Sequence, residues 1–168
     1  YYLCPTVVKA CREKGFHYVG ALKANRNLFK RGRKLKAGRY GRNLFRRAKR
    51  KSLIIPKKRR RIRYTFVDAG RMEISKLGVG HVVFSRKGKD KHLLGIVSDD
   101  PKITAREIIE AYDARWSIEV FFKDAKQLLG LGQYQNSTYS AAVIHLHLVC
   151  FAFALLTHVA ITDGKSEK

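Results

Sequence analysis

One segment of the chain is so strongly basic that it limits what the chain can fold into. Residues 23–63 contain 20 Lys and Arg and no Asp or Glu, although the whole chain has 36 basic and 13 acidic residues. Mutual repulsion between these side chains opposes independent folding of much of the segment. The net charge of +23 exceeds what solubility requires and indicates a polyanionic partner, so a carbohydrate enzyme or a binder of acidic proteins is disfavoured.

The rest of the 168-residue chain follows an α/β pattern. A Pro-Thr start and a Gly15 stop predict a helix over residues 5–15, and a β-branched and aromatic run predicts a strand over residues 17–23. A T-x-x-E capping box at Thr104 begins a long helix that ends near Gly130. Between them lie four predicted strands in a meander, at residues 62–67, 71–77, 81–85 and 92–98.

One apolar stretch near the C-terminus resembles a membrane span in length. Residues 141–161 are long enough to span a membrane, which takes about 20 residues of helix. They also contain His145, His147, Thr157 and His158, and polar groups are costly in lipid. We therefore expect a core helix that is buried on most sides, and no membrane partner.

Four polar side chains share one stripe of the predicted long helix. At 100° per residue, Arg115, Glu119 and Lys126 lie within about 60° of the direction of Tyr112. One interpretation is a solvated face, on which i, i+4 pairs with Glu119, including Lys123, contribute about a few tenths of a kcal/mol each. The other is a functional site, because the helix already has a second polar face for solvent, made of Arg106, Glu110, Asp113, Ser117 and Asp124.

The same four residues resemble the Y-R-E-K signature of DDE transposases of the insertion sequence four family. They reproduce every interval of that signature, as Tyr112-x-x-Arg115-x-x-x-Glu119-x-x-x-x-x-x-Lys126. The run AREIIEAYDARWSIEVFFKDAKQLLGL resembles the family's Glu-bearing helix. The run YYLCPTVVKACREKGFHYVGALKANR resembles the helix and strand that follow its second catalytic Asp. The resemblance covers most of residues 1–158.

This resemblance implies an α/β fold: the C-terminal part of a ribonuclease-H-like core with a basic, β-rich insertion. Residues 1–23 would form a core helix and strand, and residues 24–100 the insertion. Residues 101–162 would form the core helices that carry the Glu, together with the C-terminal apolar helix. Residues 163–168 would be a tail.

The implied activity is metal-dependent phosphodiester hydrolysis and strand transfer at transposon ends, by a DNA endonuclease and strand transferase. Glu119 would be the third carboxylate of the DDE triad and a ligand of one of two Mg²⁺ or Mn²⁺ ions. Arg115 and Lys126 would bind phosphates of the transposon end, and Tyr112 would contact the adjacent backbone. Intact, such a transposase would act as a homodimer on transposon ends and target DNA. It would lie in the cytoplasm of a bacterium or archaeon, at the nucleoid.

The two upstream aspartates of the triad have no match in the chain, which begins at Tyr1 and not at Met. We expect them in a preceding part of a longer protein, without which Glu119 leaves the metals underligated and the isolated chain inactive. Asp68, Asp99 and Asp100 are substitute ligands in principle, but turn and cap roles explain Asp at such positions.

The basic segment supports a second class of function. Its cations would bind phosphates and release counterions, and Phe29, Tyr40 and Phe45 would either stack on exposed bases or pack a small core. The alternative function is therefore a non-catalytic nucleic-acid-binding module, or a transposase remnant that keeps this segment.

Overall fold

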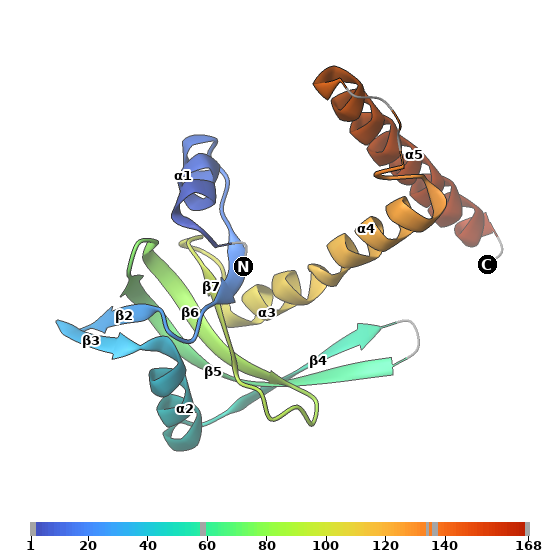
Figure 1. The fold of residues 1–168 in the computed structure, drawn as a ribbon. Coiled ribbons are helices and arrows are strands. Elements are labelled where there is room, and N and C mark those ends of the chain that lie inside the picture. The colour runs from blue at the N-terminus through green and yellow to red at the C-terminus, as the bar shows by residue number, and fades with distance from the viewer. Residues whose placement is uncertain (1–2, 58–59, 134, 136–137, 167–168) are drawn as a thin grey trace. The chain divides into compact units, whose positions relative to one another are not determined.

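The computed structural model describes residues 3–57, 60–133, 135 and 138–166. It falls into two compact units, Tyr1–Ala114 and Arg115–Lys168. The first unit is a mixed α/β structure built on a curled antiparallel sheet, and the second unit consists of two helices (Figure 1).

The sheet of the first unit has seven strands in the order β1-β7-β6-β5-β2-β3, with β4 paired to β5 beside this path. All pairs are antiparallel. The long strand β5 pairs with β4 along its first half and with β2 near its end, while β6 occupies its other edge. The strands are β1 Val19–Leu22, β2 Asn27–Lys30, β3 Arg33–Lys36, β4 Lys51–Lys57, β5 Arg60–Ile74, β6 Gly78–Lys87 and β7 Leu94–Ser98.

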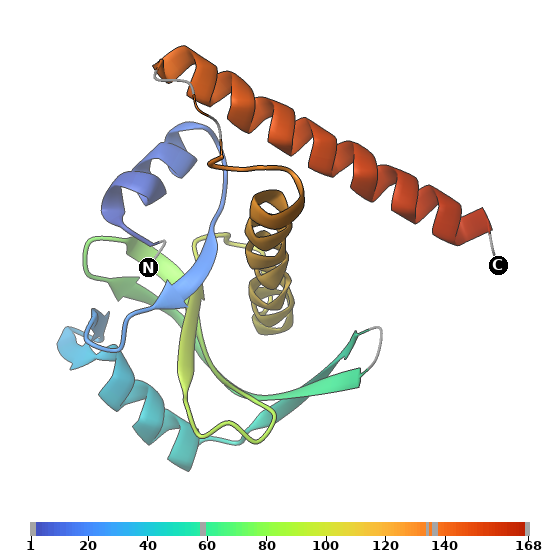
Figure 2. The same ribbon diagram turned by 45° about the vertical axis from the view of Figure 1, so that its right-hand side comes forward.

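Both faces of the central strands are covered by helices (Figure 2). Helices α1 (Pro5–Glu13) and α2 (Ala37–Arg47) cover one face, where Val82 and Val97 are buried. Helix α3 (Ala105–Ala114) covers the other face, over the next residues on the same strands, Val83 and Ile96. Because successive residues of a strand point to opposite faces, this two-sided cover explains the unbroken apolar runs of β6 and β7.

The described part of the basic segment is folded as part of the sheet of the first unit. It forms β2, β3, α2 and β4, which all lie in the first unit and are anchored on β5. Apolar residues hold it there, since Leu28 and Leu53 are buried and the cations around them are mostly exposed. Phe45 is also buried, with the guanidinium carbons of Arg86 and Arg50 lying 4.8 and 5.8 Å from its ring centroid. Core packing is therefore the role of Phe45, not stacking on bases.

Two predicted strands are in fact one. Residues 62–67 and 71–77 were expected to be separated by a turn at Asp68-Ala69-Gly70, but β5 runs through them with a bulge. Gly70 has φ +75°, and Asp68 Oδ1 accepts a hydrogen bond from its N–H at 2.8 Å. A left-handed glycine with an Asx-type hydrogen bond occurs both in turns between strands and in bulges within one strand. The sequence alone therefore did not distinguish a turn from a bulge at this position.

The single helix predicted over residues 104–130 is two helices in the structure, α3 and α4 (Trp116–Leu128). Helix α3 belongs to the first unit and α4 to the second. The predicted start of α3 is confirmed. Glu107 Oε2 accepts hydrogen bonds of 2.8 Å from both the N–H and the hydroxyl of Thr104, which lower the pKa of the Glu107 carboxyl. In the second unit, Phe121 of α4 packs edge-on against Phe153 of α5 (Tyr139–Ser166), with ring centroids 4.8 Å apart.

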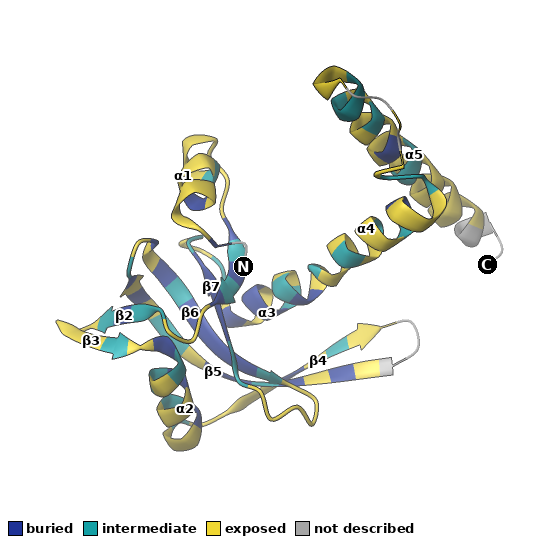
Figure 3. Cartoon of the chain, viewed as in Figure 1, coloured by how far each residue is buried: buried dark blue, intermediate teal, exposed yellow. Residues whose placement is uncertain are grey.

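Helix α5 is not the buried core helix that we expected. Only 6% of its most apolar stretch is buried, and Phe151 and Leu156 are among its exposed side chains. Figure 3 shows that most of α5 is exposed. Within its unit, α5 packs against α4. Residues Tyr139–Asp163 are long and apolar enough to cross a membrane, judged by length and composition alone. The helix continues to Ser166, and residues 167 and 168 of the predicted tail lie outside the described residues.

Candidate functional site

Three of the four signature residues lie together at the start and along one face of α4. Arg115 immediately precedes α4, and its Nη1 lies 2.6 Å from Oε1 of Glu119, one turn further on. Lys126 is exposed and follows Glu119 by two turns, so helix geometry places it on the same face. The Arg115 and Glu119 side chains are 30% and 39% exposed, so this ion pair contributes about 1 kcal/mol or less to stability.

Tyr112 belongs to α3 and thus to the first unit. Its side chain is half-buried and packs against the core cluster beneath α3, which includes Leu53 and Ile108. Part of its role is therefore structural.

The residue beside it, Asp113, was expected on a solvated helix face and is instead buried, with a side chain only 5% exposed. Its carboxylate is held by three donors from three strands. Lys57 Nζ of β4 lies 2.5 Å from Oδ2, Lys87 Nζ of β6 lies 3.3 Å from Oδ1, and the hydroxyl of Tyr64 in β5 donates to Oδ1. Asp113 thus ties α3 to the basic strands.

This buried carboxylate had a detectable signal in the sequence. Asp113 follows Ile109 by four residues, so it borders the apolar side of α3 although it also neighbours Arg106 on the polar face; at such a border an unpaired buried charge would be costly. Burial alone would raise the pKa of Asp113, but the hydrogen bonds from Lys57, Tyr64 and Lys87 outweigh burial and lower it.

We expect Asp113→Asn to lower the free energy of unfolding by about 2 kcal/mol, because it weakens hydrogen bonds to a charged acceptor. Since the pKa of Asp113 is lower in the folded state, its contribution is present above the unfolded-state pKa of about 4 and is lost as pH falls through the folded-state pKa. Urea unfolding at neutral pH and in acid measures both effects. The difference between variant and wild type should shrink in acid.

Glu110→Gln is the matched control on the same helix. Its exposed i, i+4 ion pair with Arg106, at 2.9 Å, should contribute about 0.5 kcal/mol or less. Equal losses in the two variants would contradict the role assigned to Asp113.

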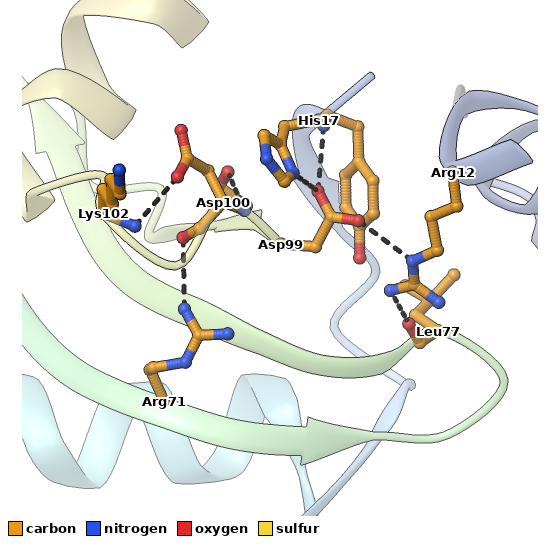
Figure 4. A network of polar contacts seen from close by, with 9 residues as sticks. Arg12, His17, Arg71, Leu77, Asp99, Asp100 and Lys102 are labelled. Atoms are coloured by element: carbon orange, nitrogen blue, oxygen red, sulfur yellow. Dashed lines mark hydrogen bonds and ion pairs between the residues drawn. The ribbon is translucent and has the colours of Figure 1, made fainter. Parts of the chain in front are cut away.

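The three aspartates considered as substitute metal ligands accept hydrogen bonds that shape the local backbone, and Figure 4 shows those of Asp99 and Asp100. Asp99 accepts hydrogen bonds of 3.0 Å from Arg12 Nε and from the backbone N–H of Tyr18. Asp100 Oδ1 accepts one of 2.8 Å from the N–H of Lys102. Asp68 accepts from the β5 bulge and lies 2.8 Å from His81 Nε2. Each therefore has a turn or anchoring role.

Glu119 is the acidic residue of the α4 face described above, and its chemistry can be compared with that of a metal ligand. No group of three His, Cys, Asp or Glu side chains that could hold a metal ion occurs among the residues that the structure describes. Glu119 is a partly exposed carboxylate, the kind of oxygen ligand that Mg²⁺ prefers. Its chemistry would suit one position of a metal centre, which needs further ligands.

Comparisons with known proteins provide an independent line of information. The model of one protein family, described as the transposase DDE domain, matches residues 1–155. No curated protein matches the chain. The matched region includes the first unit, residues 115–155 of the second unit, and Tyr112, Arg115, Glu119 and Lys126.

Proposed function

The chain belongs to the transposase DDE domain family, and from that premise we propose that it supplies the glutamate of a DDE metal triad on a ribonuclease-H-like core. The family acts on DNA through nuclease and strand-transfer chemistry and generally uses divalent metal ions. In our proposal this chain is the C-terminal part of such a catalytic domain, of the insertion sequence four family, and works at transposon ends.

The observation that carries the proposal is the grouping of charge on α4. The Glu119 carboxylate lies 2.6 Å from the Arg115 guanidinium, and Lys126 shares its helix face. A carboxylate between two cations suits a metal ion together with a phosphodiester better than it suits either partner alone. Divalent metal ions, when bound, would activate the attacking water or 3′-hydroxyl and stabilise the leaving oxygen.

Each signature residue has a separate task in this proposal. Glu119 is a metal ligand, and its release from Arg115 frees the guanidinium to bind a phosphate of the transposon end. Lys126 binds a second phosphate, and Tyr112 contacts the adjacent backbone from α3. In the proposal, the two aspartates of the triad come from a preceding part of the protein. Among the described residues, no group of three possible metal ligands occurs.

The isolated chain is expected to bind duplex DNA without cutting it. Glu119 alone leaves the metal ions underligated, so Mg²⁺ or Mn²⁺ should produce no nicking of a supercoiled plasmid, whereas a mobility-shift assay should detect binding. Robust Mg²⁺-dependent nicking that survives Glu119→Ala and further purification would show that the triad assignment is wrong.

A non-catalytic nucleic-acid-binding module, or a transposase remnant, is the second candidate. It is favoured by one observation: the described cations of residues 23–63 belong to a folded unit, whereas the described residues contain no group of three possible metal ligands. The DNA upstream of the Tyr1 codon distinguishes the two. An open reading frame with two strand-borne Asp supports the transposase, and a start codon beside Tyr1 supports the module.

The intact enzyme would be a homodimer at the bacterial or archaeal nucleoid, in the cytoplasm.

A further inference from the structure

A basic groove of about 750 Å³ lies in the first unit, where the hairpin of β2 and β3 faces α2. No carboxylate lines it. Its charged and polar lining consists of Lys30, Arg31, Arg33, Tyr40, Asn43 and Arg47.

Local geometry explains why these side chains gather. Lys30 and Arg33 are direct partners across the hairpin, so both side chains lie on the same face of the ribbon. Tyr40, Asn43 and Arg47 are spaced by three and four residues on α2, which places them on one stripe of that helix. The groove is therefore a consequence of strand register and helix period together.

The four cations of the groove lack neutralising partners. Within the described residues, none of them forms a salt bridge with a carboxylate, and the surrounding segment 23–63 contains no acidic residue. Lys30 Nζ donates a hydrogen bond of 2.7 Å to the Tyr40 hydroxyl, which holds the ammonium group at the groove. Cations confined to one groove repel each other, so a bound anion stabilises this arrangement.

The tip of the hairpin holds a cation in an unfavourable backbone conformation. Arg31 has φ +48° and Gly32 has φ +74°, as in the two-residue turns that favour Asn-Gly. Asn would adopt the left-handed conformation at lower cost than Arg. Arg31 therefore occupies a turn position that favours Asn. This indicates that the Arg31 side chain has a role other than stabilising the turn.

We propose that this groove binds the backbone phosphates of duplex DNA, as a second anchor separate from the residues of α4. The proposal rests on the proposed function for its choice of DNA as the polyanion. Lys30, Arg31, Arg33 and Arg47 bind phosphate oxygens, and binding is independent of base sequence because the groove presents charge, not a pattern of base-edge contacts.

The test compares two triple variants of the 168-residue chain that remove the same charge. The groove variant is Arg31→Asn, Arg33→Gln and Arg47→Gln. The control is Lys34→Gln, Lys49→Gln and Arg61→Gln, three exposed cations of the same basic region that do not line the groove. Affinity for a fluorescent duplex is measured by anisotropy over a series of salt concentrations.

The groove variant should bind about 100-fold more weakly near 0.1 M salt, and its plot of log affinity against log salt should be shallower by about 2.7, or 0.9 for each lost phosphate contact. The control should keep its affinity within about fivefold. Equal losses in the two variants would overturn the groove but leave DNA binding intact. Absence of DNA binding by the unmodified chain would instead overturn the proposed function.

A single variant keeps the test decisive if the triple variant misfolds. Arg31→Asn relieves the backbone strain and should raise the melting temperature by about 2 °C. It should nevertheless weaken DNA binding about threefold or more, because one phosphate contact is lost. Unchanged affinity in this more stable variant would overturn the role of Arg31 and of the groove.

Discussion

Glu119→Gln in the intact transposase is expected to abolish cleavage of transposon ends while leaving end binding nearly intact. The substitution removes a charged ligand from the metal site, and losing about 4 kcal/mol of transition-state stabilisation would slow cleavage about 1000-fold. End binding should persist because the proposed phosphate contacts come from other residues. Cleavage and mobility-shift assays on one labelled transposon end measure the two properties side by side.

Three further substitutions on the same helix separate the proposed roles. Arg115→Ala and Lys126→Ala should weaken the end complex as well as the chemistry, since both residues would bind phosphate. Lys123→Ala is the control, because Lys123 is exposed on α4 but lies outside the signature. If all four variants showed the same mild loss of stability with cleavage retained, the stripe would be only a solvated helix face.

Binding of the isolated chain to duplex DNA should depend steeply on salt. Residues 23–63 carry 20 cations and no anions, and the described part of the segment is folded onto the sheet. For six to ten phosphate contacts, affinity should fall about 10³-fold to 10⁵-fold between about 50 and 200 mM salt, with little dependence on sequence. Isothermal titration or anisotropy over this range measures the slope.

A slope near zero in that titration would contradict phosphate binding by the basic segment. A strong preference for one duplex sequence at constant salt would contradict it too, because phosphate contacts alone carry no sequence information.

Local patterns predicted local structure well. The capping box at Thr104 begins α3, and the left-handed Gly15 follows α1 as a helix stop. These signals succeed because they act between neighbouring residues and need no knowledge of the rest of the fold.

Predictions that depended on distant partners were less successful. Asp113 was assigned to a solvated face, because its three donors, Lys57, Tyr64 and Lys87, come from strands far away in the sequence. Trp116, a large apolar residue at the start of α4, is 62% exposed. Helical periodicity identifies an apolar side chain but not the element that covers it.

The basic segment shows the same limit in the opposite direction. Charge repulsion argued only against independent folding, and it did not predict that Leu28 would be buried in the core of the sheet and Phe45 buried beside it. Of the four signature residues, only those at the start of α4 and along it could be arranged from helix geometry; Arg115 and Glu119, for example, are one turn apart. Their functional roles come from the family resemblance, which the match to the transposase DDE domain supports at the level of the family.

The most direct test of the central claim, that Glu119 is a metal ligand in a DNA-cleaving centre, is a change of metal preference. In the intact transposase, Glu119→Cys replaces an oxygen ligand by a thiolate, which Mg²⁺ binds poorly and Mn²⁺ tolerates better. Cleavage rates of transposon ends are measured for wild type and variant in each metal. We predict that the variant is inactive with Mg²⁺ and regains measurable cleavage with Mn²⁺. Wild-type cleavage by the variant with Mg²⁺ would contradict the account.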